Sequence, residues 1–225
     1  MAQPVLRRLN LRLVGGFDAV WVPDAPEAPG LAGELAHGRT GRLPVRYIGA
    51  ISRMAAGQAV VPGPRYRVVA VVSGPEPQRT LLETALLAQL RAIPGDHLLV
   101  RGTPRESGER QVDRVRVVAH LQGAALADAM RGAELIVSRT GYTTLMDLVA
   151  LERSALLIPT PGQEEQEYLG RLHQRTGRFA VQDQAHIDVA RVLAAPPPHV
   201  PFASATEALL DAALTDLAAR IHPGG

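Results

Sequence analysis

The stretch that decides the fold of this 225-residue chain is AELIVSRTGYTTLMDLVALERSALLIPTPGQEEQEYLGR, residues 133–171. It contains two apolar runs long enough for buried strands, at 133–137 and 155–159. Between them lie a turn of small polar residues centred on Gly141 and a segment, 144–151, with apolar residues at helical spacing. An acidic helix is predicted from Gln163 onward. This order predicts a strand–helix–strand unit, which places its binding loops at the carboxyl ends of the strands.

The first of these loops carries chemistry suited to a nucleotide. A turn that enters a helix offers free N–H groups and the positive end of the helix dipole, which favour a phosphate. Thr143 and Thr144 add hydroxyls there, and Asp147 lies one turn into the helix, where its carboxylate could accept hydrogen bonds from the vicinal hydroxyls of a ribose. The alternative is that Thr144 caps the helix and Asp147 offsets its dipole.

Together, SRTGYTTLMDL and ALLIPTPGQEEQEYLGRL resemble the donor-binding half of the GT-B glycosyltransferases. The best match is the C-terminal domain of the MurG-like branch, family 28, which transfers N-acetylglucosamine from UDP-GlcNAc. Arg139, Gly141, Thr144 and Asp147 stand where that family has an Arg-x-Gly-x-x-Thr-x-x-Glu run, and Gln166 follows at the matching helix start. The resemblance implies that Asp147 holds the ribose hydroxyls and that Gln166 reaches the donor sugar.

Three positions depart from the family pattern. Asp147 replaces a Glu and is one methylene shorter, Glu167 replaces a common second Gln, and Gly170 replaces a usual Asn. These departures bear on the identity of the sugar more than on nucleotide binding.

A second loop at a strand end is predicted at residues 73–80, SGPEPQRT. It joins a strand at 67–73, apolar on both faces, to a helix at 81–91, with capping-box spacing between Thr80 and Glu83. In the resembling family this loop faces the donor diphosphate. Arg79 could pair with a phosphate in bidentate fashion, or could be an exposed side chain on a rigid turn. Further donors would be the Ser73 and Thr80 hydroxyls and the backbone of Gly74, Gln78 and Arg79, whereas Pro75 and Pro77 have none.

The remaining elements complete an alternating pattern. Strands are predicted at 97–101, 114–119 and 179–181, and helices at 124–131, 186–194 and 204–221; residues 102–110 are predicted to be a polar, mobile loop. About six strands alternating with helices predict a doubly wound, parallel α/β sheet, the Rossmann-like C-terminal half of GT-B. By resemblance, His120 or Leu121 would cover the uracil.

The first fifty residues read as a small separate α/β piece. A helix is predicted at 4–14, strands at 17–23 and 44–49, and a short helix at 31–37, with Asp24 and His37 in surface roles. By resemblance, 1–51 is a remnant of the N-terminal acceptor domain, 52–64 is a linker, and 65–225 is the nucleotide-sugar-binding domain. The catalytic residues would then lie on a domain that this sequence does not contain.

Composition excludes several classes of site. All 24 basic residues are Arg and are scattered among 22 acids, so a nucleic-acid stripe is not evident. Absence of Cys rules out disulfides and zinc–thiolate sites and fits the cytoplasm. Apolar runs stay well short of a membrane span, and Arg7, Arg8 and Arg12 interrupt any signal-peptide core. We expect neither a metal nor a cofactor.

These observations predict that the chain is the donor-binding part of a hexosyl- or N-acetylglucosaminyltransferase. Its donor would be a UDP-sugar, with UDP-GlcNAc as the first candidate, and this part would not be a complete enzyme on its own. By this interpretation the chain is either truncated from a longer enzyme or one half of a two-chain enzyme, whose partner would be a separate acceptor-domain chain or a second copy of itself. The alternative is a non-catalytic interaction or nucleotide-binding module derived from a GT-B enzyme, with a partner surface near Leu6, Leu9, Leu13 and the C-terminal helix. An epimerase with GT-B architecture is a third interpretation.

Overall fold

The computed structural model describes residues 16–38, 44–54, 66–202 and 206–221. The chain divides into two compact units, one formed by residues 1–51 with 203–225 and the other by residues 52–202. The predicted helix at 4–14 and most of the predicted linker at 52–64 lie outside the described residues. The predicted nucleotide-sugar-binding domain ran to residue 225, whereas the structure groups residues 203–225 with the first unit.

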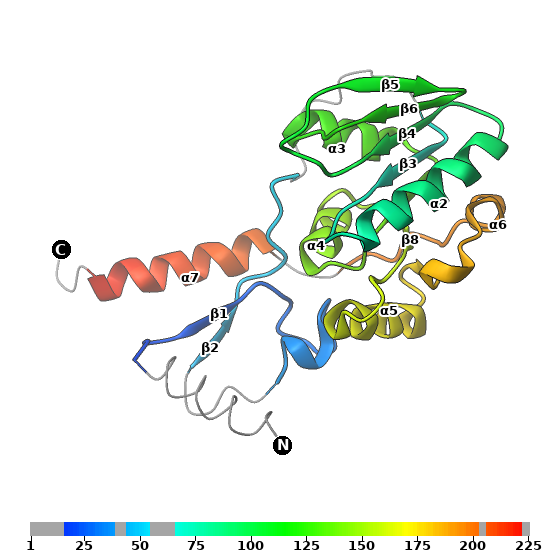
Figure 1. Cartoon of the computed structure of the whole chain (residues 1–225). Coiled ribbons are helices and arrows are strands. Elements are labelled where there is room, and N and C mark those ends of the chain that lie inside the picture. Colours follow the sequence, from blue (N-terminus) through cyan, green and yellow to red (C-terminus); the bar gives the residue numbers. More distant parts are fainter. Residues whose placement is uncertain (1–15, 39–43, 55–65, 203–205, 222–225) are drawn as a thin grey trace. The chain divides into compact units, whose positions relative to one another are not determined.

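The larger unit, within the described residues, is built on a seven-stranded sheet in the order β5-β6-β4-β3-β7-β8-β9 (Figure 1). Neighbouring strands pair in parallel, except that β5 runs antiparallel to β6. The parallel, doubly wound sheet predicted from the alternating pattern is therefore confirmed. The strands are β3 (Val68–Val71), β4 (His97–Val100), β5 (Glu109–Val112), β6 (Val115–Val118), β7 (Leu135–Ser138), β8 (Leu156–Leu157) and β9 (Ala180–Val181).

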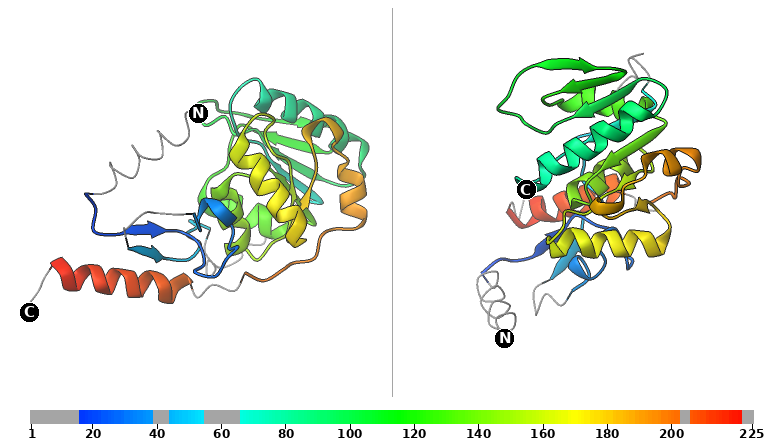
Figure 2. Two further views of the ribbon diagram at one scale, coloured as in Figure 1. Left: turned by 90° about the horizontal axis from the view of Figure 1, so that it is seen from below. Right: turned by 45° about the vertical axis from the view of Figure 1, so that its right-hand side comes forward.

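Helices cover both faces of this sheet (Figures 1 and 2). On one face lie α2 (Gln78–Ala92) and α6 (Val189–Ala194), which share an apolar core with the strands. The connection from β3 to β4 runs toward the β5 edge of the sheet, whereas those from β6 to β7, β7 to β8 and β8 to β9 run toward the β9 edge. Because crossovers are right-handed, the helices of the last three connections lie on the opposite face from α2. These are α3 (Gly123–Gly132), α4 (Tyr142–Ala150) and α5 (Glu164–Thr176); a 3-10 turn, η2 (Gln184–His186), precedes α6.

The core follows from the sequence periodicity. Leu82, Leu86 and Leu90 recur every four residues on α2 and are fully buried. Each such side chain stabilises the fold by about 2 kcal/mol. The strands under them are buried on both faces, which explains why their sequences are continuous apolar runs rather than alternating ones.

One predicted loop proves to be partly a strand. Residues 109 and 110, the last two of the predicted mobile loop, belong to β5 (Glu109–Val112), which pairs with β6 in an antiparallel hairpin. Its sequence, Glu-Arg-Gln-Val, lacks the apolar residues that indicate a buried strand, because β5 is a solvent-exposed edge. Just before it, Gly102 has φ +68°, and a Cβ there would stand 2.2 Å from the Val72 carbonyl oxygen. Only glycine fits where these two chain segments cross.

The smaller unit contains a two-stranded parallel sheet, β1 (Val20–Val22) with β2 (Val45–Tyr47), a 3-10 turn, η1 (Gly33–Leu35), and α7 (Thr206–Ile221). Arg46 joins β2 to α7 through an ion pair of 2.8 Å with Asp216. Asp24, predicted as a surface residue, is instead fully buried. Its carboxylate accepts hydrogen bonds of 2.7–3.1 Å from the backbone N–H groups of Ala25, Leu31 and Ala32 and so organises the loop around η1.

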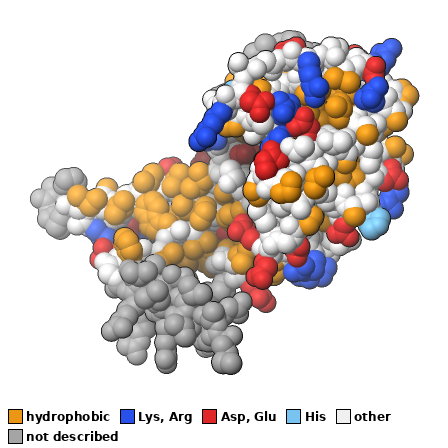
Figure 3. All heavy atoms as spheres, in the orientation of Figure 1, with side chains coloured by type: hydrophobic (Ala, Val, Ile, Leu, Met, Phe, Trp, Pro, Cys, Tyr) orange, Lys and Arg blue, Asp and Glu red, His pale blue; other side chains and the backbone are white. Residues whose placement is uncertain are grey.

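Helix α7 keeps much of its apolar surface exposed. Leu214, Leu217 and Ile221 are 42–62% exposed and recur at helical spacing. Figure 3 shows hydrophobic side chains gathered along this helix. Within the described residues, no helix is both long and apolar enough to cross a membrane.

Candidate nucleotide-sugar site

The topology places two predicted loops at one point. The chain leaves β3 toward β4 and β6, then returns across β3 to form β7, so the direction of winding reverses between β3 and β7. In open α/β sheets, ligands bind in the crevice at such a switch point, beyond the carboxyl ends of the strands. Val71 and Ser138 are register partners at the ends of the two strands, and the Ser138 hydroxyl donates to the Val71 carbonyl at 3.1 Å. The loops that begin at Ser73 and Arg139 are therefore neighbours.

Arg139 fastens three loops together rather than facing solvent. Its side chain is 1% exposed, and its guanidinium donates to the carbonyl oxygens of Ile158, Pro159 and Gln78 at 2.9–3.3 Å. Burial lowers the pKa of the guanidinium to about 10. Among the described residues, no carboxylate lies within ion-pair distance of it. This geometry favours a scaffold role for Arg139, and the ligand contact implied by the resemblance stays a prediction.

The accessible part of the loop after β7 is the start of α4. Ser138, Arg139 and Thr140 are buried, whereas Gly141 is half-buried and Thr143 is exposed. Gly141 is the N-cap residue and has no side-chain cap, so Thr144 lies inside the helix and the alternative that it caps α4 is wrong. The first turn also contains no acidic residue. Among the described residues, this end of α4 thus has no side-chain cap, and its positive dipole suits a phosphate.

Gly141 has a conformation open to other residues. Its φ is −70°, and an added Cβ would meet only the Thr144 hydroxyl oxygen, at 3.7 Å. Neither backbone strain nor crowding by the described residues requires glycine here. The close approach of a ligand to the backbone would be another reason for a glycine at this position.

Asp147 lies in the second turn of α4, half-buried, and takes a partner that the sequence did not indicate. Its Oδ1 accepts a hydrogen bond of 2.5 Å from the hydroxyl of Ser52, 95 residues earlier in the chain. Burial raises the pKa of the carboxyl group, while the Ser52 hydrogen bond and the charge of Arg53 lower it. Among the residues that the structure describes, Oδ2 has no hydrogen-bond partner.

The Ser73–Thr80 loop differs most from the prediction. Arg79 is buried, not exposed, and its guanidinium bonds to Glu76, Glu83 and the Thr80 hydroxyl at 2.6–2.8 Å. The backbone N–H of Arg79 donates to Pro75, and that of Thr80 to the Glu76 carboxylate.

Two corrections follow for this loop. Because two carboxylates already neutralise Arg79, its proposed phosphate pairing would have to break two ion pairs. Glu76, not Glu83, takes the helix-capping role, because α2 begins at Gln78 and places Thr80 and Glu83 within the helix. The Ser73 hydroxyl and Gly74 remain exposed at the carboxyl end of β3.

The loop after β8 is held by Gln166. Its side-chain oxygen accepts from the Thr160 N–H at 3.0 Å, and its amide nitrogen donates to Gln163 at 2.5 Å. Thr160 is buried, and in the described part of the chain its hydroxyl has no hydrogen-bond partner. That hydroxyl faces Gly74, since a Cβ on Gly74 would stand 3.7 Å from it. Gln166 thus shapes the loop, and its reach to a donor sugar stays a prediction.

Gly170, where the family has Asn, is buried against this same loop. A Cβ there would lie 2.7 Å from Pro159 Cγ, which accounts for a residue without a side chain. His120 and Leu121, predicted to cover the base, follow β6 and are both half-buried. Their strand is separated from β3 by β4, so they lie at the same edge of the sheet but two strands away.

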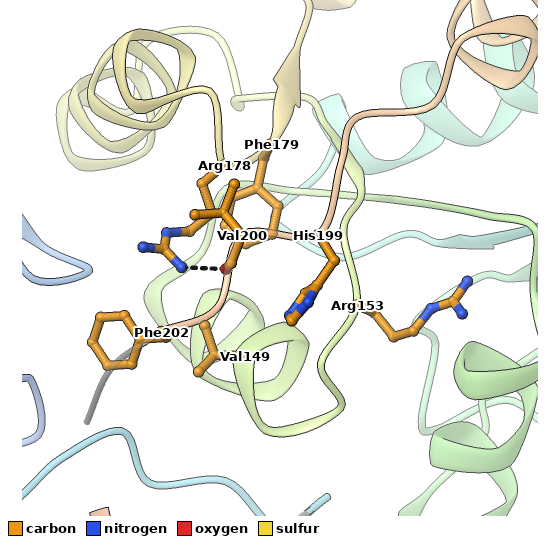
Figure 4. Close-up of a pocket in the computed structure, with 7 residues that line it drawn as sticks. All are labelled: Val149, Arg153, Arg178, Phe179, His199, Val200 and Phe202. Atoms are coloured by element: carbon orange, nitrogen blue, oxygen red, sulfur yellow. Dashed lines mark hydrogen bonds between the residues drawn. The ribbon is translucent and has the colours of Figure 1, made fainter. Parts of the chain in front are cut away.

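A shallow pocket lies elsewhere, between the end of α4 and the segment after α6 (Figure 4). It contains none of the predicted site residues. Arg178 donates to the Val200 carbonyl at 2.7 Å and lies over the Phe202 ring, 5.3 Å from its centroid. In Figure 4 the guanidinium groups of Arg153 and Arg178 point to opposite sides of the pocket, so they do not converge on one ligand position.

A doubly wound sheet with a helix amino end and a half-buried carboxylate near its switch point is the arrangement in which open α/β proteins bind their ligands. Comparison with known families is more specific: residues 103–187 match the model of the glycosyltransferase family 28 C-terminal domain. The resemblance found in residues 133–171 is therefore confirmed. The matched segment includes α4 and the loops after β6, β7 and β8.

Solved structures with a similar fold are glycosyltransferases. The glycotransferase of kitacinnamycin has a TM-score of 0.56 at 18% identity, over 90% of this chain and 51% of that one. SnogD from Streptomyces nogalater has a TM-score of 0.53 at 17% identity, over 89% and 56%. MurG of Acinetobacter baumannii has a TM-score of 0.49 at 14% identity, over 92% and 60%. The first two show the GT-B type of fold, and the chain spans only 51–56% of their length. Comparison with curated proteins gives no match.

Proposed function

We propose that the larger unit binds a nucleotide-sugar at the β3/β7 switch point and is the donor-binding part of a glycosyltransferase. The ligand class is a UDP-sugar, with UDP-GlcNAc as first candidate, and the transferred group is a hexosyl residue. The observation that carries this proposal is the juxtaposition of the uncapped amino end of α4 with the Asp147 carboxylate, within the segment that matches the family model.

Each residue has a chemical task in this proposal. The N–H groups at the start of α4, with the Thr143 hydroxyl, would donate hydrogen bonds to the diphosphate oxygens and stabilise the negative charge that develops on the leaving nucleotide. Asp147 would accept the ribose hydroxyls through Oδ2 and the remaining lone pairs of Oδ1. Ser73 and Gly74 would line the opposite side of the crevice. His120 and Leu121 would cover the base. Acceptor binding and the catalytic base are proposed to come from an acceptor-binding domain outside these 225 residues.

Calorimetric titration with UDP tests the proposal, with ADP and GDP as controls. We expect selective UDP binding. Asp147→Ala should weaken it by a few-fold to about a hundredfold, the loss expected from charged hydrogen bonds. Glu152→Ala is the matched control for Asp147→Ala, because both changes remove one carboxylate and Glu152 is exposed just beyond the other end of α4.

Gly141→Ala separates ligand contact from folding. Because an alanine Cβ fits without strain or clash, the variant should unfold at the wild-type temperature yet bind UDP more weakly. Unchanged UDP affinity in folded Asp147→Ala and Gly141→Ala variants would refute the site.

The exposed apolar face of α7 favours a second candidate, a non-catalytic interaction module. Its residues Leu214, Leu217 and Ile221 would bury against a partner or second copy. Light scattering over a range of concentrations tests this: a monomer at high concentration that binds UDP favours the donor-binding proposal, whereas a stable oligomer without UDP binding favours the module.

A further inference from the structure

The hydrogen bond between Ser52 and Asp147 links the first residues of the larger unit to the proposed ribose carboxylate. The Ser52 hydroxyl donates to Asp147 Oδ1 at 2.5 Å and accepts from the N–H of Met54 at 2.9 Å. Both of its hydrogen-bonding directions are therefore fixed, and the single hydroxyl proton is directed at the carboxylate.

We propose that Ser52 is a positioning residue for Asp147, whose hydroxyl fixes the carboxylate in the orientation that ribose hydroxyls require. This inference rests on the proposed function of Asp147 as the ribose-binding group.

The segment that carries Ser52 is itself anchored. Arg131 on α3 donates to the Met54 carbonyl oxygen at 3.4 Å and is held by an ion pair of 3.1 Å with Asp128. Residues 52–54 are thus fastened to α3 while Ser52 reaches α4. A side chain presented from such a fixed segment can restrict the rotation of a carboxylate, which otherwise costs free energy when the ligand binds.

Ser52 leaves room for the ligand. An ionised carboxylate has about four lone-pair directions, and the serine uses one of them. Oδ2 has no partner in the described part of the chain, so two vicinal hydroxyls can still be accepted without displacing Ser52. The contact is therefore compatible with ligand binding.

Ser52 also supports the charge of the carboxylate. Burial raises the pKa of Asp147, and the opposing influences are the Ser52 hydrogen bond and the positive charge of Arg53. Arg131 and Asp128, which lie beside this segment in the described part of the chain, form an ion pair with each other. Loss of the Ser52 hydroxyl should move the titration of Asp147 to higher pH, so that a smaller fraction is ionised in mildly acidic solution.

The test compares wild type with Ser52→Ala, Ser52→Thr and the control Ser154→Ala. The hydroxyl of Ser154 donates to the backbone carbonyl oxygen of Arg178, away from the site. UDP affinity is measured by calorimetry across an acidic to neutral pH series, and circular dichroism checks the fold. We expect Ser52→Ala to lose affinity about threefold to tenfold, the range for one hydrogen bond, and to shift the acid midpoint of binding upward. Ser52→Thr should restore both, and Ser154→Ala should change neither.

Two results would overturn the inference. In the first, Ser52→Ala keeps the UDP affinity and the acid midpoint of the wild type. In the second, Ser52→Ala binds UDP more tightly, which would mean that Ser52 competes with the ligand for Asp147. A pH titration of the Asp147 carboxyl carbon by NMR, without ligand, distinguishes a failure of the Ser52 inference from a failure of the proposed function. If wild type binds no UDP, the proposed function fails together with the ribose role, while an unshifted Asp147 titration in Ser52→Ala independently refutes the hold of Ser52 on the carboxylate.

Discussion

Glu83 forms ion pairs with several arginines beside the β3–α2 loop, so replacing its carboxylate with a neutral group should destabilise the larger unit. Its Oε2 accepts from Arg79 at 2.7 Å and its Oε1 from Arg101 at 2.8 Å, with Arg110 farther off at 3.7 Å. The side chain is 10% exposed. Glu83→Gln keeps its volume but removes the charge that these arginines share.

The magnitude follows from what remains after the change. Two hydrogen bonds to charged groups are worth about 3–6 kcal/mol together. Arg79 keeps Glu76, Arg101 keeps Glu106, and the glutamine oxygen still accepts one bond, so we expect a net loss of about 2–3 kcal/mol. For a unit of this size that corresponds to a fall of about 5–10 °C in Tm.

The assay is urea and thermal unfolding followed by circular dichroism. Glu106→Gln is the matched control, because Glu106 pairs with the same Arg101 but is 52% exposed. An exposed pair is worth at most about 1 kcal/mol. A double-mutant cycle with Arg101→Gln measures the coupling directly. If Glu83→Gln costs less than about 1 kcal/mol, or no more than Glu106→Gln, the reasoning from burial and shared charge is wrong.

Two further predictions concern other positions. Gly102→Ala should cost about 2–4 kcal/mol of unfolding free energy, because its Cβ would stand 2.2 Å from the Val72 carbonyl oxygen at a positive φ. Gly132→Ala, with open space around it, should be neutral or slightly stabilising; equal denaturation midpoints for the two variants would contradict this. The second prediction concerns pH: the stability of Asp147→Asn relative to wild type should increase as pH rises through the acid range. Burial raises the folded pKa of Asp147, so the folded state binds more protons between the unfolded and folded pKa values of this group, and the contribution of Asp147 to wild-type stability falls with rising pH there. A constant stability difference in urea titrations from about pH 3 to 6 would count against that sign.

The fold could be predicted further than the site, because its signals are local. The strands at 67–73, 97–101 and 133–137 are apolar runs, and a buried parallel strand needs little else. Strand β5 escaped prediction because an exposed edge strand needs no apolar residues, and its backbone pairs with β6 in an antiparallel hairpin that no local pattern indicated.

At the site, sequence reasoning placed Asp147 and the start of α4 at the carboxyl edge of the sheet but not their partners. Ser52 lies 95 residues away from Asp147, and no local pattern indicates that pairing. Arg79 and Arg139 look alike in sequence, as arginines in strand-end loops. Whether such a side chain faces a ligand or the protein depends on carboxylates and carbonyls brought near it by folding, here Glu83 for Arg79 and Ile158 for Arg139.

The short hairpin strand β5 has a consequence for handling the protein. Without it, the sheet would end at the apolar strand β6, whose unpaired backbone could recruit a strand from another molecule. Instead the border carries Glu109, Arg110 and Gln111, and Glu109 is locked across the hairpin to Arg116 at 2.7 Å. At the opposite border, β9 is two residues long. Both margins of the sheet thus resist strand-by-strand aggregation, a property that concentrated calorimetry and NMR samples require.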